Sequence, residues 1–157
     1  MYQRILVPVD GRDAAKRGLE EAIKLSKTLG SQLCIVHIVD DSALALNPEA
    51  GIAAAPLVKD FAEGGKEILD EAIARAADQG VRADGVMHEN FTGRIPDLIA
   101  DEAKKWGAEL IVMGTHGRSG IRHAVLGSDA EAVVHATEVP VLLVRTPLKA
   151  KGTKSNL

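Results

Sequence analysis

The stretch Arg4-Ile-Leu-Val-Pro-Val-Asp10 decides how the rest of the chain is interpreted. Its apolar residues form one continuous run that ends at a turn-forming Asp-Gly pair. Such a run is too short for a typical helix, and it does not alternate as a half-exposed strand would. Continuous apolar strands are typical of parallel sheets that helices cover on both faces. The stretch therefore predicts a buried strand in an α/β protein.

Similar apolar runs recur along the chain, with helical patterns between them. The predicted strands after the first span residues 33–39, 81–88, 109–113 and 141–144, the second of these being the weakest. The predicted helices span residues 13–29, 58–79, 95–106 and 128–137. This βαβαβαβαβ order predicts a single Rossmann-like α/β domain, with an open parallel five-stranded sheet and helices on both faces.

Several residues mark the expected ends of these elements. Asp13 is a candidate N-cap for the first helix, and Gly30 suits its C-terminal stop. Gly64 and Gly65 weaken the start of the second helix, so we expect an irregular turn there. Residues 42–56 are Ala-rich with weak periodicity, which predicts a long loop that could act as a lid.

Composition narrows the possible functions. The chain has 157 residues, of which 46% are hydrophobic, and its net charge is −3. That size suits one domain, and an acidic chain is poorly suited to binding a nucleic-acid backbone. The one cysteine, Cys34, excludes an intrachain disulfide and a four-cysteine zinc site.

No apolar run approaches the length of about 18 residues that indicates a membrane span. The sequence also runs from Met1 into the first strand without a signal-peptide core, so we expect a cytoplasmic protein. Residues 1–146 form the predicted domain, and residues 147–157, which carry three lysines and no acid, a flexible basic tail.

A glycine-rich segment follows the predicted strand at 109–113. It contains Gly114, Gly117 and Gly127, and it ends at Ser128, where a helix is expected to begin. Glycines permit positive φ and close approach of a ligand, while the N–H groups of a helix N-terminus bind phosphate. Arg118 would add positive charge. The segment predicts a phosphate cradle, although it lacks the Gly-Lys-Ser/Thr of a Walker A loop.

The spacing Gly114-x2-Gly117-x9-Gly127-Ser128 resembles the motif of the ATP-binding branch of the universal stress protein family. The opening Ile5-Leu-Val-Pro-Val-Asp10-Gly11 and the closing Val139-Pro-Val-Leu-Leu-Val144 are similar to that family's first and last strands. The resemblance covers roughly residues 2–145. It implies the strand order 3-2-1-4-5, with a crevice where the first and fourth strands lie side by side. Arg12 departs from the pattern, because the family commonly has Ser or Thr there.

The resemblance also implies how ATP or AMP, with Mg²⁺ or Mn²⁺ as a candidate counterion, would be held. Asp10 would bind ribose or adenine, and the backbone of Ile38 would meet the adenine edge. Met113 and Gly114 would lie near the ribose and phosphates. The predicted nucleotide-binding residues are Pro8, Asp10, Ile38, Met113, Gly114, His116, Gly117, Arg118, Gly127 and Ser128.

Four of these residues also have a purely structural interpretation. Ser128 and Glu131 form a Ser-x-x-Glu capping-box pattern, and Asp10 could simply cap a turn. Pro8 suits strand geometry, and Arg118 could be a solvated charge.

Five residues outside the motif also need an interpretation. His37 and His88 are expected to be packed or hydrogen-bonded, and Cys34 to be an inert core thiol. Asp40-Asp41, at a predicted strand end, is a candidate for contact with a metal on the nucleotide.

Three functions remain open from the sequence. The first is an ATP-binding sensor or regulator in a stress response. The second is a slow ATPase or nucleotide hydrolase on the same fold, although no catalytic set of residues is evident. The third is a nucleotide-independent dimeric interaction protein. In each case the apolar edge strand Val141–Val144 predicts a homodimer, an arrangement that the family resemblance also implies. An FMN protein is disfavoured because aromatic residues make up only 3% of the chain.

Overall fold

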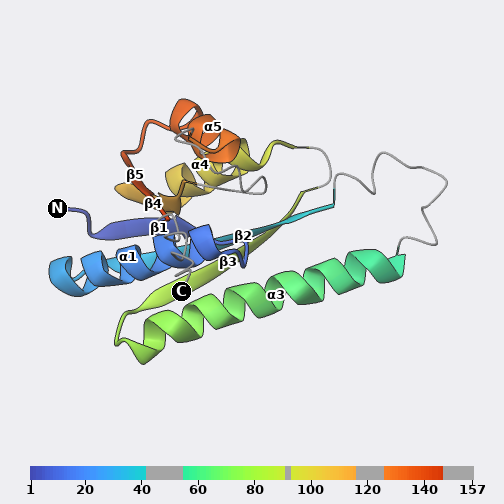
Figure 1. Ribbon diagram of the computed structural model, residues 1–157, viewed down its shortest axis with the longest axis horizontal. Coiled ribbons are helices and arrows are strands. Elements are labelled where there is room, and N and C mark those ends of the chain that lie inside the picture. Colours follow the sequence, from blue (N-terminus) through green and yellow to red (C-terminus); the bar gives the residue numbers. More distant parts are fainter. Residues whose placement is uncertain (42–54, 91–92, 116–125, 147–157) are drawn as a thin grey trace, which may run out of the picture.

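The computed structural model describes residues 1–41, 55–90, 93–115 and 126–146, and these residues contain every predicted strand and helix. Element labels follow Figure 1. The strands are β1 Arg4–Pro8, β2 Gln32–Asp40, β3 Ala83–Asn90, β4 Leu110–Gly114 and β5 Val141–Val144. The helices are α1 Asp13–Leu29, α3 Ala55–Asp78, α4 Ile95–Trp106 and α5 Ser128–Ala136. The predicted βαβαβαβαβ order is confirmed.

The strands form a parallel sheet in the order β3-β2-β1-β4-β5, as predicted. β1 lies at its centre, where Ile5 is in register with Leu33 of β2 and with Leu110 of β4. Because strands pair with both edges of β1 and helices pack on both faces, every residue from Ile5 to Val7 is fully buried. The continuous apolar run reflects this central place in the sheet.

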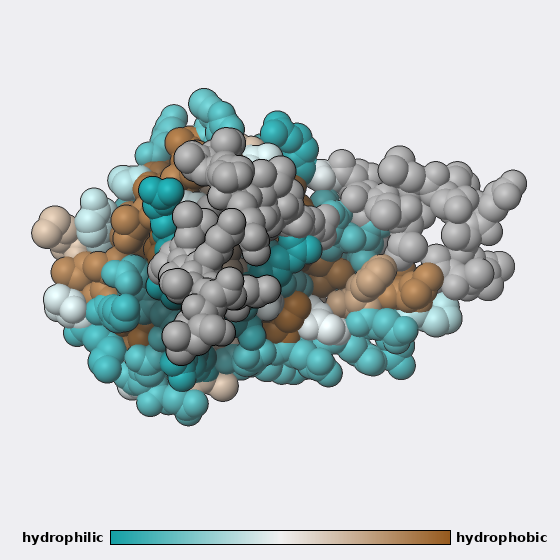
Figure 2. Space-filling model, viewed as in Figure 1, coloured by the Kyte–Doolittle hydropathy of each residue, from teal (hydrophilic) through white to brown (hydrophobic). Residues whose placement is uncertain are grey.

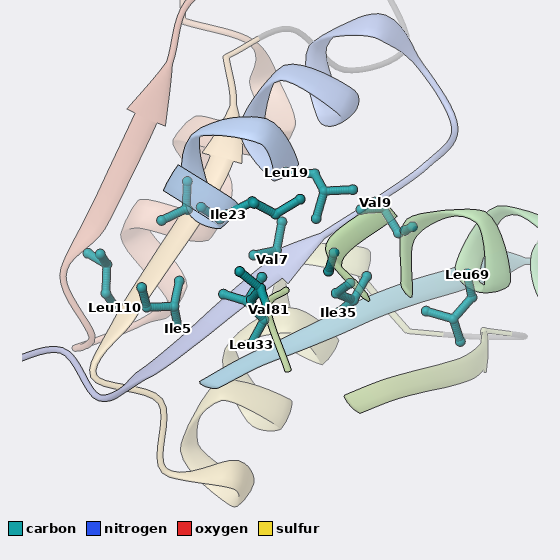
Figure 3. Close-up of a cluster of buried hydrophobic side chains, with 14 residues drawn as sticks. Ile5, Val7, Val9, Leu19, Ile23, Leu33, Ile35, Leu69, Val81 and Leu110 are labelled. Carbon is teal, nitrogen blue, oxygen red and sulfur yellow. The ribbon is translucent and has the colours of Figure 1, made fainter. Parts of the chain in front are cut away.

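Helices cover both faces of the sheet (Figure 1). Ile5 and Val7 of β1 pack with α1 and α3, and Figure 3 shows this cluster around Leu19 and Ile23. The intervening Leu6 packs on the opposite face with residues of α4 and α5. None of the helices within the described residues has the length and apolar character to cross a membrane.

The start of α1 corrects one sequence prediction. Arg12, not Asp13, is the N-cap residue, and its side chain makes no capping hydrogen bond. The turn is instead held by Asp10, whose Oδ1 accepts a hydrogen bond from the Arg12 N–H at 2.9 Å. This turn places Asp13 inside the first turn of the helix. The C-terminal stop at Gly30 is confirmed, with φ of 71°.

The long helix α3 corrects two further predictions. It begins at Ala55, so Ala55 and Pro56 belong to the helix rather than to the predicted loop, whose residues 42–54 lie outside the described residues. Proline suits a first turn because its missing N–H has no partner there. Leu57 and Phe61 are exposed near this end, where Figure 2 shows hydrophobic surface.

The Gly64-Gly65 pair does not interrupt α3. Gly65 lies against β2, and a Cβ atom there would be 2.7 Å from Cγ2 of Val39 and 2.9 Å from Cδ2 of His37. The His37 ring is held in place, because its Nδ1 is 2.8 Å from the Val9 carbonyl oxygen. Close packing of α3 on the sheet therefore requires glycine at 65, whereas a Cβ at Gly64 would meet nothing within 4 Å.

We predict opposite effects for alanine at these two adjacent positions. Gly65→Ala should lower the free energy of unfolding by about 1–3 kcal/mol, because the new methyl group displaces Val39 or His37. Gly64→Ala should raise it by about 0.5–1 kcal/mol, since alanine favours the helix and its methyl group would meet no neighbouring atom within 4 Å. Urea unfolding of both variants measures the difference. Equal stabilisation by both would contradict the packing described for α3.

Candidate functional site

A pocket opens at the carboxyl ends of β1 and β4. This is the point where the strand order reverses, since β2 and β3 lie on one side of β1 and β4 and β5 lie on the other. Its enclosed volume is about 100 Å³. Such switch points are where open α/β sheets bind ligands. Five predicted residues line this pocket, namely Pro8, Asp10, Ile38, Met113 and Gly114. The tertiary structure thus brings together residues from three strands that are distant in the sequence.

A second hollow of about 360 Å³ adjoins the first, and Ile95 and Asp129 line both. Ser128 lines the second hollow, and Gly127 precedes it at the start of α5. The N–H group of Gly127 donates to the Thr115 carbonyl oxygen at 2.8 Å, which ties this helix end to the end of β4. His116, Gly117 and Arg118 lie outside the described residues.

The first pocket has apolar walls and acidic charges. Val36, Ile38 and Ile99 contribute aliphatic surface. Among the described residues that line it, the charged side chains are those of Asp10 and Asp129. Asp10 is exposed and Asp129 is half-buried in the first turn of α5. A pocket of this character suits a ligand with a flat ring that packs on the aliphatic walls and with hydrogen-bond donors that meet the carboxylates.

Asp10 has the structural role that the sequence left open. One of its carboxylate oxygens accepts the Arg12 N–H, and no other hydrogen bond joins Asp10 to a described residue. The capped turn fixes the position of this carboxylate at the pocket. Its role in binding a ligand stays a prediction.

The positive φ angles that glycine permits are not used at Gly114 or Gly127. Gly127 has φ of −59° and ψ of 143°, an ordinary extended conformation. At Gly114 the need for glycine is steric, since a Cβ would be 2.3 Å from the carbonyl oxygen of Ala14. A Cβ at Gly18 of α1 would likewise be 2.9 Å from the Gly114 nitrogen. Gly114 is therefore required for α1 to pack against the end of β4.

The predicted capping box at the start of α5 is not formed. Gly127 is the N-cap residue, there is no side-chain cap, and the Glu131 N–H donates to the Gly127 carbonyl oxygen at 3.0 Å. Ser128 consequently falls inside the helix rather than before it. Its side chain is exposed on the hollow and forms no hydrogen bond with the described residues. The hydroxyl group is thus available to a ligand.

Sequence reasoning missed Asn90, Arg94 and Asp129. The buried Asn90 side chain donates to the Gly93 carbonyl oxygen at 2.9 Å and accepts the Gly93 N–H at 2.8 Å. Arg94 lines the second hollow. The Asn and Gly three residues apart form a turn signal that could have drawn attention to this segment.

The histidines and the cysteine behave as expected. His37 is buried with Nδ1 at 2.8 Å from the Val9 carbonyl oxygen, and His88 Nε2 lies 2.9 Å from Oε2 of the buried Glu102. Cys34 is fully buried, and this burial raises the pKa of its thiol to about 12, which makes it unreactive.

Asp40 and Asp41 follow one another at the carboxyl end of β2. The described residues contain no group of three or more potential ligands arranged for a metal ion. Asp41 is 1% exposed, and neither of its carboxylate oxygens has a hydrogen-bond partner among the described residues. Burial raises the pKa of Asp41, and the negative charges of Glu89 and Asp40 raise it further.

The fold and the pocket define the class of open α/β proteins that bind ligands at the switch point of a parallel sheet. Comparison with known proteins identifies the family. Residues 1–145 match the universal stress protein family, and the chain belongs to that family. A universal stress protein of Methanocaldococcus jannaschii, MJ0531, is 32% identical over 95% of this chain and 85% of its own length.

Solved structures confirm the fold. Universal stress protein UspA from Lactobacillus plantarum superposes with a TM-score of 0.80, at 26% identity, over 92% of this chain and 98% of its own. Two other universal stress proteins, each 25% identical, were solved with nucleotides. One is in complex with cAMP (TM-score 0.65, 92% of this chain and 97% of its own). The other, from Archaeoglobus fulgidus, is in complex with dAMP (TM-score 0.63, 90% and 97%).

We predict that Asp41→Asn stabilises the protein at neutral pH. Because the pKa of Asp41 is higher in the folded than in the unfolded chain, the native state binds the proton more tightly. The native state therefore loses stability as pH rises from the unfolded pKa of about 3.9 through the higher folded pKa. The amide removes this penalty. Urea unfolding across about pH 4–8 should show a higher midpoint at neutral pH and a weaker decline with pH. An unchanged profile would contradict the description of Asp41 as a buried carboxylate without a partner among the described residues.

Proposed function

We propose that this protein binds an adenine nucleotide, ATP or AMP, at the carboxyl ends of β1 and β4, and that it acts as a sensor or regulatory protein in a stress response. The observation that carries the proposal is the convergence of Pro8, Asp10, Ile38, Met113 and Gly114 on one pocket. The relatives solved with cAMP and dAMP support an adenine nucleotide as the ligand.

The walls of the pocket support the placement of the nucleoside. The aliphatic side chains of Val36, Ile38 and Ile99 suit one face of an adenine ring. The carboxylate of Asp10, fixed by the Arg12 N–H, suits a ribose hydroxyl donor. These two contacts would orient the nucleoside so that its phosphates point toward α5.

The start of α5 supports the placement of the phosphates. The N–H groups of residues 128–130 precede the first hydrogen bond within the helix, so they are free to donate to a phosphate. Gly127 and the exposed Ser128 hydroxyl lie at this end. His116, Gly117 and Arg118 would complete the cradle.

The charge of the site supports a metal counterion for ATP. Asp10 and Asp129 both place a carboxylate at the pocket, and both would repel a bare triphosphate. Mg²⁺ or Mn²⁺ bound to the phosphates would offset this repulsion, since oxygen ligands suit both ions. AMP, with fewer charges, depends less on such a cation.

We predict that Gly127→Val abolishes measurable binding of ATP. Valine tolerates the extended backbone at this position, so the fold should persist, while its side chain would fill the space where a phosphate meets α5. Calorimetry with ATP and Mg²⁺ measures the effect, and Gly64→Ala, which lies away from the pocket, is the control. No binding by the unaltered protein at millimolar ATP, with no nucleotide co-purifying, would refute the proposed function.

We also propose that the protein is a homodimer formed through β5. This strand lies at the edge of the sheet, and it is apolar at every position. The carbonyl groups of Pro140 and Val144 accept hydrogen bonds from Ile111 and Thr115 on the β4 side. Because backbone groups alternate in direction along a strand, the N–H groups of Val141 and Leu143 face the open edge. A second copy could pair with them in antiparallel fashion around a twofold axis.

We predict that Leu143→Pro converts this dimer to a monomer while leaving the pairing of β5 with β4 intact. Proline removes an N–H that faces the edge, and the twofold axis doubles the loss. Leu143→Ala, which loses similar packing but keeps the N–H group, should remain dimeric. Size exclusion with light scattering measures the mass. A monomeric unaltered protein at tens of micromolar would refute the dimer.

A further inference from the structure

Arg94 occupies an unusual position beside the proposed nucleotide pocket. It lines the 360 Å³ hollow and also a neighbouring hollow of about 380 Å³, and Ser128 lines both of them with it. The Arg94 side chain is exposed and forms no ion pair or hydrogen bond with another described residue. Among the described residues, the Arg94 guanidinium group and the Ser128 hydroxyl group therefore line the same hollow without a hydrogen-bond partner.

The backbone holds Arg94 in a fixed position. The Arg94 carbonyl oxygen accepts hydrogen bonds from the N–H groups of Asp97 at 3.1 Å and Leu98 at 3.2 Å. The preceding residue, Gly93, is held from both sides by the buried amide of Asn90. The start of the Arg94 side chain is therefore rigidly placed at the edge of the hollow, which lowers the cost of ordering it on a ligand.

Arginine is an unfavourable residue at the start of α4. Arg94 is the N-cap residue of α4 and makes no side-chain cap. Short polar residues normally cap helices, and a cation next to a helix N-terminus faces the positive end of the helix dipole. Arg12 caps α1 in the same way, so it is the place of Arg94 at the hollow, not the missing cap, that suggests a contact with a ligand.

The other charges of the hollow are negative, so a phosphate group there would depend on this cation. The described charged residues that line it are Asp40, Asp129 and Arg94. The two carboxylates would repel the end of a phosphate chain, so the guanidinium is the group of this hollow that attracts it. Its planar array of donors matches two phosphate oxygens at once.

The two cavities adjoin one another. Ile95 and Asp129 line both the nucleoside pocket and the hollow that contains Arg94 and Ser128. A phosphate next to the ribose would lie at the start of α5, and phosphates further along the chain would extend toward Arg94.

We propose that Arg94 binds the terminal phosphates of the nucleotide and makes the site favour ATP over AMP, an inference that rests on the proposed nucleotide-binding function. Arg94 would then distinguish nucleotides by their number of phosphates, a distinction that the glycine motif by itself does not make.

The test is calorimetry with ATP and AMP, each with Mg²⁺, on the full chain and three variants. Arg94→Ala should weaken ATP binding by about tenfold to a hundredfold, the range expected for losing hydrogen bonds to a charged group. AMP binding should change by less than about twofold. Arg94→Lys, which keeps the charge but loses the planar fork, should fall between the two. Arg82→Ala, an equal change of charge at the start of β3, at the opposite end of the strand from Arg94, should leave both affinities unchanged.

Two results would overturn the inference while leaving the proposed function intact. One is ATP binding that Arg94→Ala leaves unchanged, and the other is an equal loss for ATP and AMP. Failure of the unaltered chain to bind either nucleotide would refute the proposed function itself. Urea unfolding of Arg94→Ala provides the structural control, because removing a cation from the start of α4 should leave stability equal or slightly higher. A large loss of stability would instead assign Arg94 a structural role.

Discussion

The burial of β1 on all sides is the constraint on which the rest of the structure depends. Ile5 and Val7 face α1 and α3, Leu6 faces α4 and α5, and strands pair with both edges. A central parallel strand of this kind requires helical connections on both faces, since right-handed crossovers leave it in opposite directions. The carboxyl end of β1 therefore opens beside that of β4, and this opening contains the site.

The close packing of α1 on β4 shapes that opening. Gly18 and Gly114 let the two backbones approach until a single Cβ atom would collide with the main chain opposite. Gly65 likewise allows α3 to lie close to β2. Glycine at these positions allows the helices to pack on the sheet. This requirement is independent of any ligand contact at Gly114. A motif glycine can thus have a structural and a functional reason at once.

Positive helix ends and negative side chains lie together at the carboxyl edge of the sheet. The N-termini of α1, α4 and α5 attract anions, whereas Asp10, Asp41 and Asp129 add negative charge. Within the described residues Asp41 is buried without a hydrogen-bond partner, and Arg94 faces the positive end of its own helix. Both arrangements are unfavourable for local stability, and such costs concentrate at functional sites.

The sequence by itself determined the order of the elements, the burial of the first strand and the residues at the ends of β1 and β4. Apolar runs and glycine stops are local signals, and family resemblance supplied the strand order. Only the tertiary structure decided the rest. Helix caps at Arg12 and Gly127 depend on how the preceding turn is held. Arg94 and Ser128 meet at one hollow because α4 and α5 cover the same face of the sheet. Periodicity indicates which face of a helix is buried, but it carries no information on which distant residue lies opposite.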